Sequence, residues 1–70
     1  MRIELNGESV ELPDGATVQD AAAAAGAEEV GRGVAVALDG EVVPRSRLVE
    51  TVLSEGQRVE VVAAIGGGAA

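Results

Sequence analysis

The residues best suited to take part in chemistry are the last ones, Ile65-Gly66-Gly67-Gly68-Ala69-Ala70. Glycine has no Cβ, so three glycines in a row can enter a slot too narrow for side chains and bring a carbonyl carbon to a partner's active site. Ordering glycine also costs more conformational entropy than ordering any other residue, so we expect residues 66–70 to form a flexible tail. The alternative interpretation is a frayed terminus or a cloning remnant that has no function.

The composition argues against catalysis by the chain itself. Its 70 residues include neither Cys nor His, so the usual zinc sites and nucleophile–base pairs cannot form. Lys is absent as well, and no two acidic residues have a spacing that indicates an acid–base pair. We therefore expect a protein that is not an enzyme, with no catalytic residue, no metal site and no bound cofactor.

Charge and the lack of aromatic side chains argue against nucleic acid as a partner. A net charge of −7 repels phosphate backbones, and without an aromatic residue there is no platform on which bases could stack. No apolar run is long enough to cross a bilayer, and the first residues, Met1-Arg2-Ile3-Glu4, do not begin an apolar signal segment. We expect a cytoplasmic protein that binds neither nucleic acid nor membrane.

The elements that must position the tail begin with a hairpin and a helix. Residues 2–6 alternate polar and apolar side chains, Asn6-Gly7 predicts a type I′ turn, and residues 8–12 should form the return strand. Thr17 is a suitable N-cap for a short alanine-rich helix, and Gly26 is a suitable residue to end it.

The second half of the chain predicts three more strands. Residues 34–38 are apolar throughout, which predicts a strand buried on both faces, and Asp39-Gly40 connects it to a short return strand at residues 41–43. Residues 57–65 should form the longest strand. The apolar residues expected to pack the intervening loop against the core are Leu48, Val52 and Leu53.

The order strand, strand, helix, strand, short strand, long strand predicts an α+β fold. We expect a ubiquitin-like β-grasp: a mixed sheet of four to five strands with the short helix packed on one face, the first and last strands as central neighbours, and the hairpins flanking them. Residues 1–65 should form this domain and residues 66–70 the flexible C-terminal Gly-Gly tail.

Two further positions are candidates for partner contact. Arg45-Ser46-Arg47 is the one local concentration of positive charge, and it could bind an acidic partner surface or a phosphate, or form a solvated turn. Val62 falls on the solvent face of the last strand, where it is either part of a docking patch or an ordinary exposed valine.

Over nearly its whole length the chain resembles the sulfur-carrier proteins of thiamin biosynthesis, a family of small bacterial ubiquitin-like proteins. The most specific part of the resemblance is the block from Gly33 to Ser46, which reads Gly-Val-Ala-Val-Ala-Leu-Asp-Gly-Glu-Val-Val-Pro-Arg-Ser. The other matching stretches are Asn6-Gly7-Glu8, Leu12-Pro13-Asp14-Gly15-Ala16-Thr17-Val18 and the final strand from Gly56 to Ile65.

This resemblance implies a mechanism that uses the chain's own carboxyl terminus. In the family, an E1-like adenylyltransferase uses ATP to adenylate the carboxylate of a terminal Gly-Gly, and sulfur from a cysteine desulfurase relay displaces AMP. The resulting thiocarboxylate donates sulfur to the thiazole ring. Carried over to this sequence, the resemblance makes Gly68 the site of adenylation and thiocarboxylation, with Gly66 and Gly67 as the lead into the active site. It implies an E1-like adenylyltransferase as one partner, and thiazole synthase or another sulfur acceptor enzyme as the second.

The end of the chain departs from the family pattern. Members typically end in Gln-Gly-Gly, whereas here Gly66 takes the Gln position and Ala69-Ala70 follow the glycine pair. Three explanations are open: a proform trimmed by a C-terminal peptidase, a cloning remnant, or a carrier activated at Ala70. We favour trimming, because some related carriers of specialised pathways have C-terminal extensions that are removed.

Two alternative functions also remain open. The protein could carry sulfur for another pathway, such as molybdopterin, amino-acid or secondary-metabolite synthesis. It could instead be a ubiquitin-like protein-binding module whose tail is not used.

Overall fold

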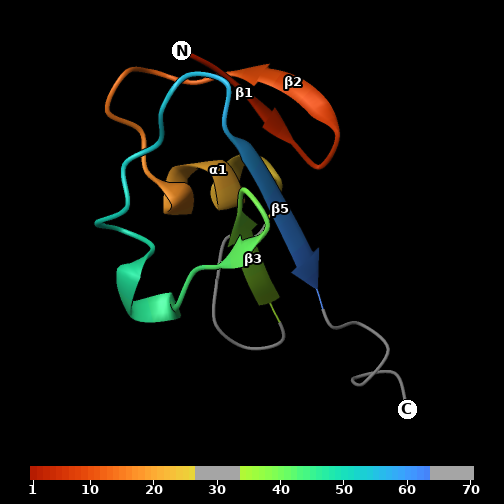
Figure 1. Cartoon of the computed structure of the whole chain (residues 1–70), viewed down its shortest axis with the longest axis vertical. Coiled ribbons are helices and arrows are strands. Elements are labelled where there is room, and N and C mark those ends of the chain that lie inside the picture. Colours follow the sequence, from red (N-terminus) through yellow and green to blue (C-terminus); the bar gives the residue numbers. More distant parts are fainter. Residues whose placement is uncertain (27–33, 64–70) are drawn as a thin grey trace.

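Two antiparallel hairpins and one long strand build the sheet of this protein (Figure 1). The computed structural model describes residues 1–26 and 34–63. The predicted tail therefore lies outside the described residues, as does the predicted end of the domain at residue 65. In chain order the elements are β1 (Arg2–Leu5), β2 (Glu8–Glu11), α1 (Val18–Ala24), β3 (Val34–Leu38), β4 (Glu41–Val42), the 3₁₀ helix η1 (Arg45–Arg47) and β5 (Arg58–Ala63).

Within the described residues the strands form one five-stranded sheet in the order β2-β1-β5-β3-β4. Strand β1 runs parallel to β5, with Glu4 opposite Arg58 and Leu5 opposite Val59, while every other neighbouring pair is antiparallel. The first and last strands are thus the central neighbours, and α1 lies on one face of the sheet (Figure 1). The predicted α+β β-grasp is confirmed.

Both hairpins turn at the predicted dipeptides. Asn6 has φ of 51° and Gly7 has φ of 85°, and the second hairpin repeats this pattern with Asp39 at 51° and Gly40 at 88°. A type I′ turn needs positive φ at both central residues, a conformation that Asn, Asp and Gly tolerate best. These two dipeptides therefore set the pairing register of both hairpins.

Helix α1 begins and ends at the predicted residues. Its start is a capping box: the Thr17 amide donates to Asp20 Oδ2 at 2.9 Å, and the Asp20 amide donates to Thr17 Oγ1 at 3.3 Å. Gly26, with φ of 92°, ends the helix. The buried side chains Ala21 and Ala22 are small, so the helix can lie close on the sheet.

The core lies between α1 and the sheet and consists only of aliphatic side chains. The loop between η1 and β5 closes one side of it with Leu48 and Leu53, which are 1% and 4% exposed. The other core residues are Ile3, Leu5, Val18, Ala21, Ala22, Val36 and Val59.

The prediction that Val52 packs against this core was wrong, because Val52 is 57% exposed. The backbone here is extended and pairs with the start of α1: the Leu53 amide donates to the Ala16 carbonyl at 2.9 Å, and the Val18 amide donates to the Thr51 carbonyl at 3.0 Å. Successive side chains of an extended segment point to opposite sides, so with Leu53 in the core Val52 must point outward.

Strand β3 was predicted to be buried on both faces, which was also wrong. Val36 is 1% exposed, whereas its neighbour Ala35 is exposed. Among the described residues α1 covers one face of the sheet, so an apolar side chain on the other face meets solvent. The continuous apolar run of β3 thus supplies core residues and surface residues in alternation.

Candidate functional site

The sheet face opposite α1, here called the outer face, has a charged half. The charged half lies over β2, β1 and the start of β5. Arg2 Nη2 lies 3.3 Å from Glu11 Oε1, and Arg58 Nε lies 3.4 Å from Glu4 Oε2. Arg2 and Glu11 are cross-strand partners, as are Glu4 and Arg58, so each ion pair follows directly from the strand register.

The other half of the outer face carries Glu60 on β5, opposite Ala37 on β3, and a group of apolar side chains that we call the outer patch: Ala35, Ala37, Val42 and Val62. Val62 on β5 lies opposite Ala35 on β3, and Ala37 lies opposite Val42 on β4. Val62 is 62% exposed and Val42 is 71% exposed. The alanines between them are small, so a partner surface can approach the sheet closely and contact both valines.

The structure places Val62 on the solvent face of β5, where the alternation of the last strand had put it; its contact with a partner stays a prediction. Val42 was missed by the sequence reasoning. The signal was present, because the two-residue Asp39-Gly40 turn fixes Leu38 opposite Glu41 and therefore Ala37 opposite Val42. Once Ala37 is assigned to the solvent face, Val42 must lie on that face too.

Two turn side chains hold β5 from opposite edges. Asn6 Oδ1 accepts a hydrogen bond from the Val61 amide at 2.8 Å, and the Asn6 amide donates to the Val59 carbonyl at 2.9 Å. On the β3 side, Asp39 Oδ1 accepts from the Arg58 amide at 3.0 Å. The start and the middle of β5 are thereby fixed relative to both hairpins, and the arrow of β5 points away from the end of the molecule that holds the N-terminus (Figure 1).

The predicted tail residues Gly66, Gly67 and Gly68 follow β5 in the sequence and lie outside the described residues. Arg45 lies in η1 and is exposed. The structure does not bring Arg45 and Val62 together in one row of side chains, since β3 and β4 separate β5 from η1 in the sheet order. They are candidates for two separate contacts.

The N-terminal ammonium is held against the end of the first hairpin. It donates to the Leu12 carbonyl at 2.6 Å and lies 3.4 Å from Asp14 Oδ1 and 3.5 Å from Glu11 Oε2. Desolvation by itself would lower the pKa of this ammonium, but hydrogen bonding and Coulombic attraction to Asp14 and Glu11 outweigh it and raise the pKa above its ordinary value of 8.0. The cluster fastens the start of β1 and contains no group suited to catalysis.

Within residues 1–26 and 34–63, no three His, Cys, Asp or Glu side chains are grouped so that they could hold a metal ion. No helix in the described part of the chain is long and apolar enough to span a membrane.

Comparison with known proteins finds similarity to one protein family and to solved structures. Residues 2–68 match the sequence profile of the ThiS family. Among solved structures, the chain is similar to the crystal structure of a thiamine biosynthesis protein (ThiS) from Geobacter metallireducens, with a TM-score of 0.74 and 25% sequence identity over 90% of this chain and 93% of that chain. No curated protein sequence gives a match.

Proposed function

The chain belongs to the ThiS family, and from this premise we propose that it carries sulfur for thiamin biosynthesis as a thiocarboxylate on the carboxyl terminus of Gly68. The observation that carries the proposal is the extent of the family match, which runs from residue 2 to residue 68 and so ends at the last glycine of the run. The likeness to the thiamine biosynthesis protein of Geobacter metallireducens supports the same assignment.

The proposed chemistry has three steps. A peptidase first hydrolyses the Gly68–Ala69 bond, because a Gly68 carbonyl held in an amide is a poor nucleophile and a poor acyl donor. An oxygen of the freed carboxylate, ionised at pH 7, then attacks the α-phosphorus of ATP and releases pyrophosphate. Sulfide finally attacks the acyl carbon of the adenylate and displaces AMP, which leaves the thiocarboxylate. The activating enzyme supplies the catalysis, and this chain is the carrier.

The geometry of β5 supports the transfer of a tail into a partner's active site. Gly68 follows the end of β5 at Ala63 by five residues. Five extended residues span at most about 17 Å, so Gly68 can be delivered that far from the sheet while the folded domain stays outside the active site. The pairing of Ala63 with Val34 on β3 fixes the point from which this reach is measured.

We further propose that the activating enzyme, an E1-like adenylyltransferase, docks on the outer patch. One member of the patch, Val62, lies on the strand that leads into the tail, and the two most exposed members, Val42 and Val62, are apolar residues whose burial favours association. A domain docked through Val62 places the start of the tail at the edge of the interface. Thiazole synthase is the proposed acceptor of the sulfur.

Mass spectrometry of the intact protein tests the proposed chemistry. Two versions would be incubated with ATP, an E1-like adenylyltransferase and sulfide: the full chain, and a chain ending at Gly68. The chain ending at Gly68 should gain the mass of an oxygen-to-sulfur exchange, and the full chain should stay unchanged unless Ala69 and Ala70 are first removed. A chain ending at Gly67 is the matched control, because it keeps a glycine carboxylate that reaches one residue less far.

The positive control is the natural carrier of the adenylyltransferase, which the enzyme must modify under the same conditions. If it does so and neither version of this chain is modified, the carrier proposal is refuted, and the alternative function as a protein-binding module remains. If the full chain is modified at Ala70, the carrier function stands but the assignment to Gly68 is wrong.

A pair of valine variants tests the docking surface. Val62→Asp should raise the KM for the carrier in adenylation about tenfold, because a carboxylate replaces an apolar contact in the proposed interface. Val52→Asp is the matched control: Val52 is similarly exposed but does not lie on the outer face, so its KM should be unchanged. Equal KM values for the two variants would contradict docking through the outer patch.

A further inference from the structure

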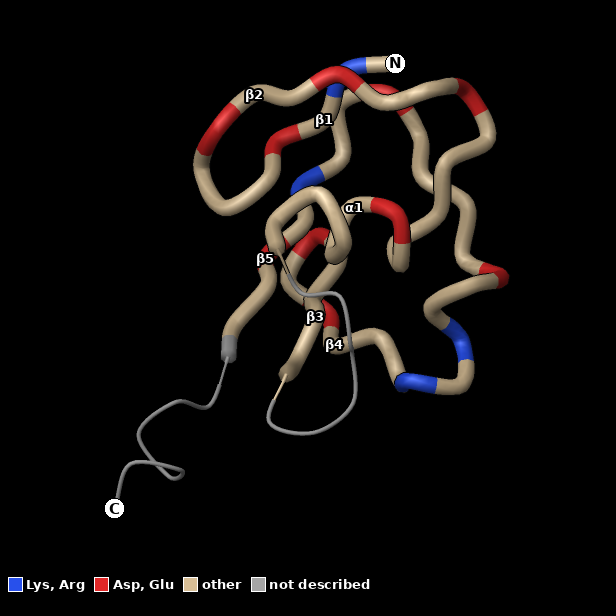
Figure 2. The backbone as a smooth tube through the Cα atoms, turned by 180° about the vertical axis from the view of Figure 1, so that it is seen from behind, with Lys and Arg blue, Asp and Glu red and all other residues tan. Residues whose placement is uncertain are grey.

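Two arginines of this acidic protein lie away from the acidic hairpin of β1 and β2, although Glu41 and Arg47 line one surface hollow and Glu50 follows Arg47 by three residues. Arg2 and Arg58 are each paired with a glutamate on the outer face, whereas Arg45 and Arg47 make no ion pair with any described residue. Both lie in η1, at the corner of the molecule beyond β4 and far from the acidic hairpin of β1 and β2 (Figure 2). Since the net charge of the chain is −7, such a corner offers a negatively charged partner positive charge that most of the acidic chain lacks.

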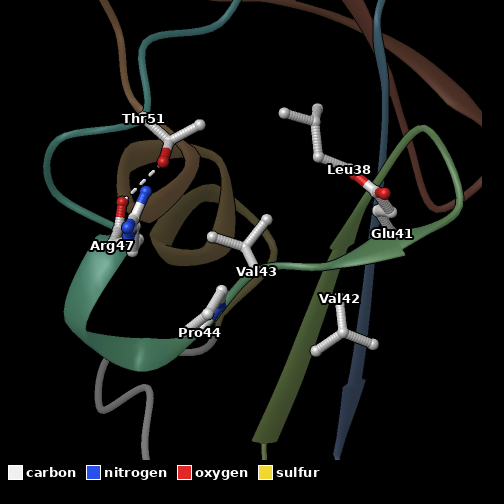
Figure 3. A pocket seen from close by; sticks show the side chains of 7 residues that line it. All are labelled: Leu38, Glu41, Val42, Val43, Pro44, Arg47 and Thr51. Atoms are coloured by element: carbon white, nitrogen blue, oxygen red, sulfur yellow. Dashed lines mark hydrogen bonds between the residues drawn. The ribbon is translucent and has the colours of Figure 1, made fainter.

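An apolar hollow adjoins this corner (Figure 3). Leu38, Val43 and Pro44 contribute apolar walls, with Arg47 on one side and Glu41 on the other (Figure 3). The hollow measures about 210 Å³, which is room for one aliphatic side chain rather than for a large ligand. The site therefore offers an open hollow with apolar walls and, next to it, two arginines that make no ion pair with a described residue.

The turn that presents the two arginines is well anchored. The Arg47 amide donates to the Pro44 carbonyl at 2.8 Å, and Thr51 Oγ1 donates to the Arg47 carbonyl at 2.6 Å. Directly after η1, Leu48 is inserted into the core and is 1% exposed. The backbone of the corner is thus held in place before any partner binds, which reduces the entropy cost of binding.

We propose that η1 and the hollow form a docking site for an acidic segment of a partner protein, which inserts one aliphatic side chain into the hollow and places its carboxylates against Arg45 and Arg47. Free phosphate would use the arginines and leave the apolar walls without a function, so the combination favours a peptide. This surface shares Val42 with the outer patch but includes neither Val62 nor the Gly68 carboxylate, so its failure and that of the carrier proposal can be distinguished.

The test uses the isotope-labelled full chain and synthetic nonapeptides observed by NMR. The probe peptide has one central Leu flanked by Asp and Glu; one control replaces the acids by Asn and Gln, and a second replaces the Leu by Ser. The probe should shift the amide signals of Val43, Arg47 and Thr51 in a saturable manner, and it should bind at least fivefold more tightly than either control. Raising the salt concentration should weaken its binding.

Two charge-reversal variants make the comparison specific. Arg47→Glu should weaken binding of the probe peptide at least fivefold, whereas Arg2→Glu, which changes the net charge equally on the outer face, should leave it within twofold. Unchanged signals of core residues such as Val36 would show that each variant keeps the fold.

Several results would overturn the proposal. Equal affinity for the three peptides, or shifts confined to Ala35 and Val62 of the outer patch, would show that the hollow is not a peptide site. Inorganic phosphate that produces the same shifts and displaces the probe would make the corner an anion site only. Shifts that depend on protein concentration without peptide would assign the surface to a second copy of the chain.

Discussion

Replacing Asn6 tests whether a side chain from the first hairpin holds the last strand. Asn6 Oδ1 accepts the Val61 amide at 2.8 Å, across 55 positions of sequence. Asn6→Gly keeps the positive φ of the turn and removes this acceptor. Asn6→Asp keeps both, since Asp39 already has the same φ of 51° and accepts an amide of β5 in the second hairpin.

The expected loss follows from the contacts of Asn6. The bond is near solvent, so water can replace the lost acceptor and the net cost is about 1 kcal/mol. Glycine adds about 0.5 kcal/mol through the greater freedom of the unfolded chain. Asn6→Gly should therefore lower the free energy of unfolding by about 1.5 kcal/mol, which for a domain of this size is about 6–12 °C in Tm. Asn6→Asp should be within about 0.5 kcal/mol of the original chain.

Far-UV circular dichroism during urea and thermal unfolding is the suitable assay, because the chain has no aromatic residue to give intrinsic fluorescence. Hydrogen exchange of the Val61 amide adds a local reading: it should be faster in Asn6→Gly than in Asn6→Asp. The reasoning is refuted if both variants lose the same stability, or if Asn6→Gly unfolds at the original temperature with unchanged exchange at Val61.

The remaining predictions concern the core and the chain start. Leu48→Ala should lower the free energy of unfolding in urea by about 2–5 kcal/mol, because the Leu48 side chain is 1% exposed. Val52→Ala should lower it by less than about 0.5 kcal/mol, because Val52 is 57% exposed. Equal losses would contradict the assignment of Leu48 to the core and of Val52 to the surface. The Met1 ammonium has a raised pKa in the folded state, so its contribution to stability is complete below pH 8.0 and is lost as the pH rises through the folded pKa. A chain acetylated at Met1 should lack this decline in urea midpoint between pH 8 and pH 10, and an identical decline in both forms would disprove the assignment. The chain has no His, Cys, Lys or Tyr to titrate in that interval.

Local patterns predicted most of the fold because each depends on a few neighbouring residues. Asn6-Gly7 and Asp39-Gly40 need positive φ and can be identified by residue type alone, and Thr17 followed by Asp20 marks the helix start. Val52 was misassigned because the bridge to Thr17 that fixes its orientation joins residues far apart in the sequence. An apolar residue in a loop carries no local signal of which side it will face.

The candidate site was predicted less completely for the same reason. Val62 follows from the alternation of one strand, but the outer patch is formed only when β5, β3 and β4 pair in a particular register. The hydrogen bonds of Asn6 and Asp39 to β5 likewise depend on long-range pairing. Turn residues are recognised by their backbone preference, and that preference does not say which distant amide their side chains will accept.

The parallel pairing of β1 and β5 has a mechanical consequence. β1 begins near the N-terminus and β5 runs in the same direction toward the opposite end of the molecule (Figure 1), so tension between Met1 and the chain beyond Ala63 slides the two strands along each other. In this shear geometry the bonds of the Glu4 and Gln57 pair, the Asn6 and Val59 pair and the Asn6 and Val61 pair share the load. Tension across a hairpin would instead open its bonds one after another. An unfolding motor that pulls on the C-terminus while the N-terminus is held should therefore stall longer on this domain than one that pulls β2 away from β1.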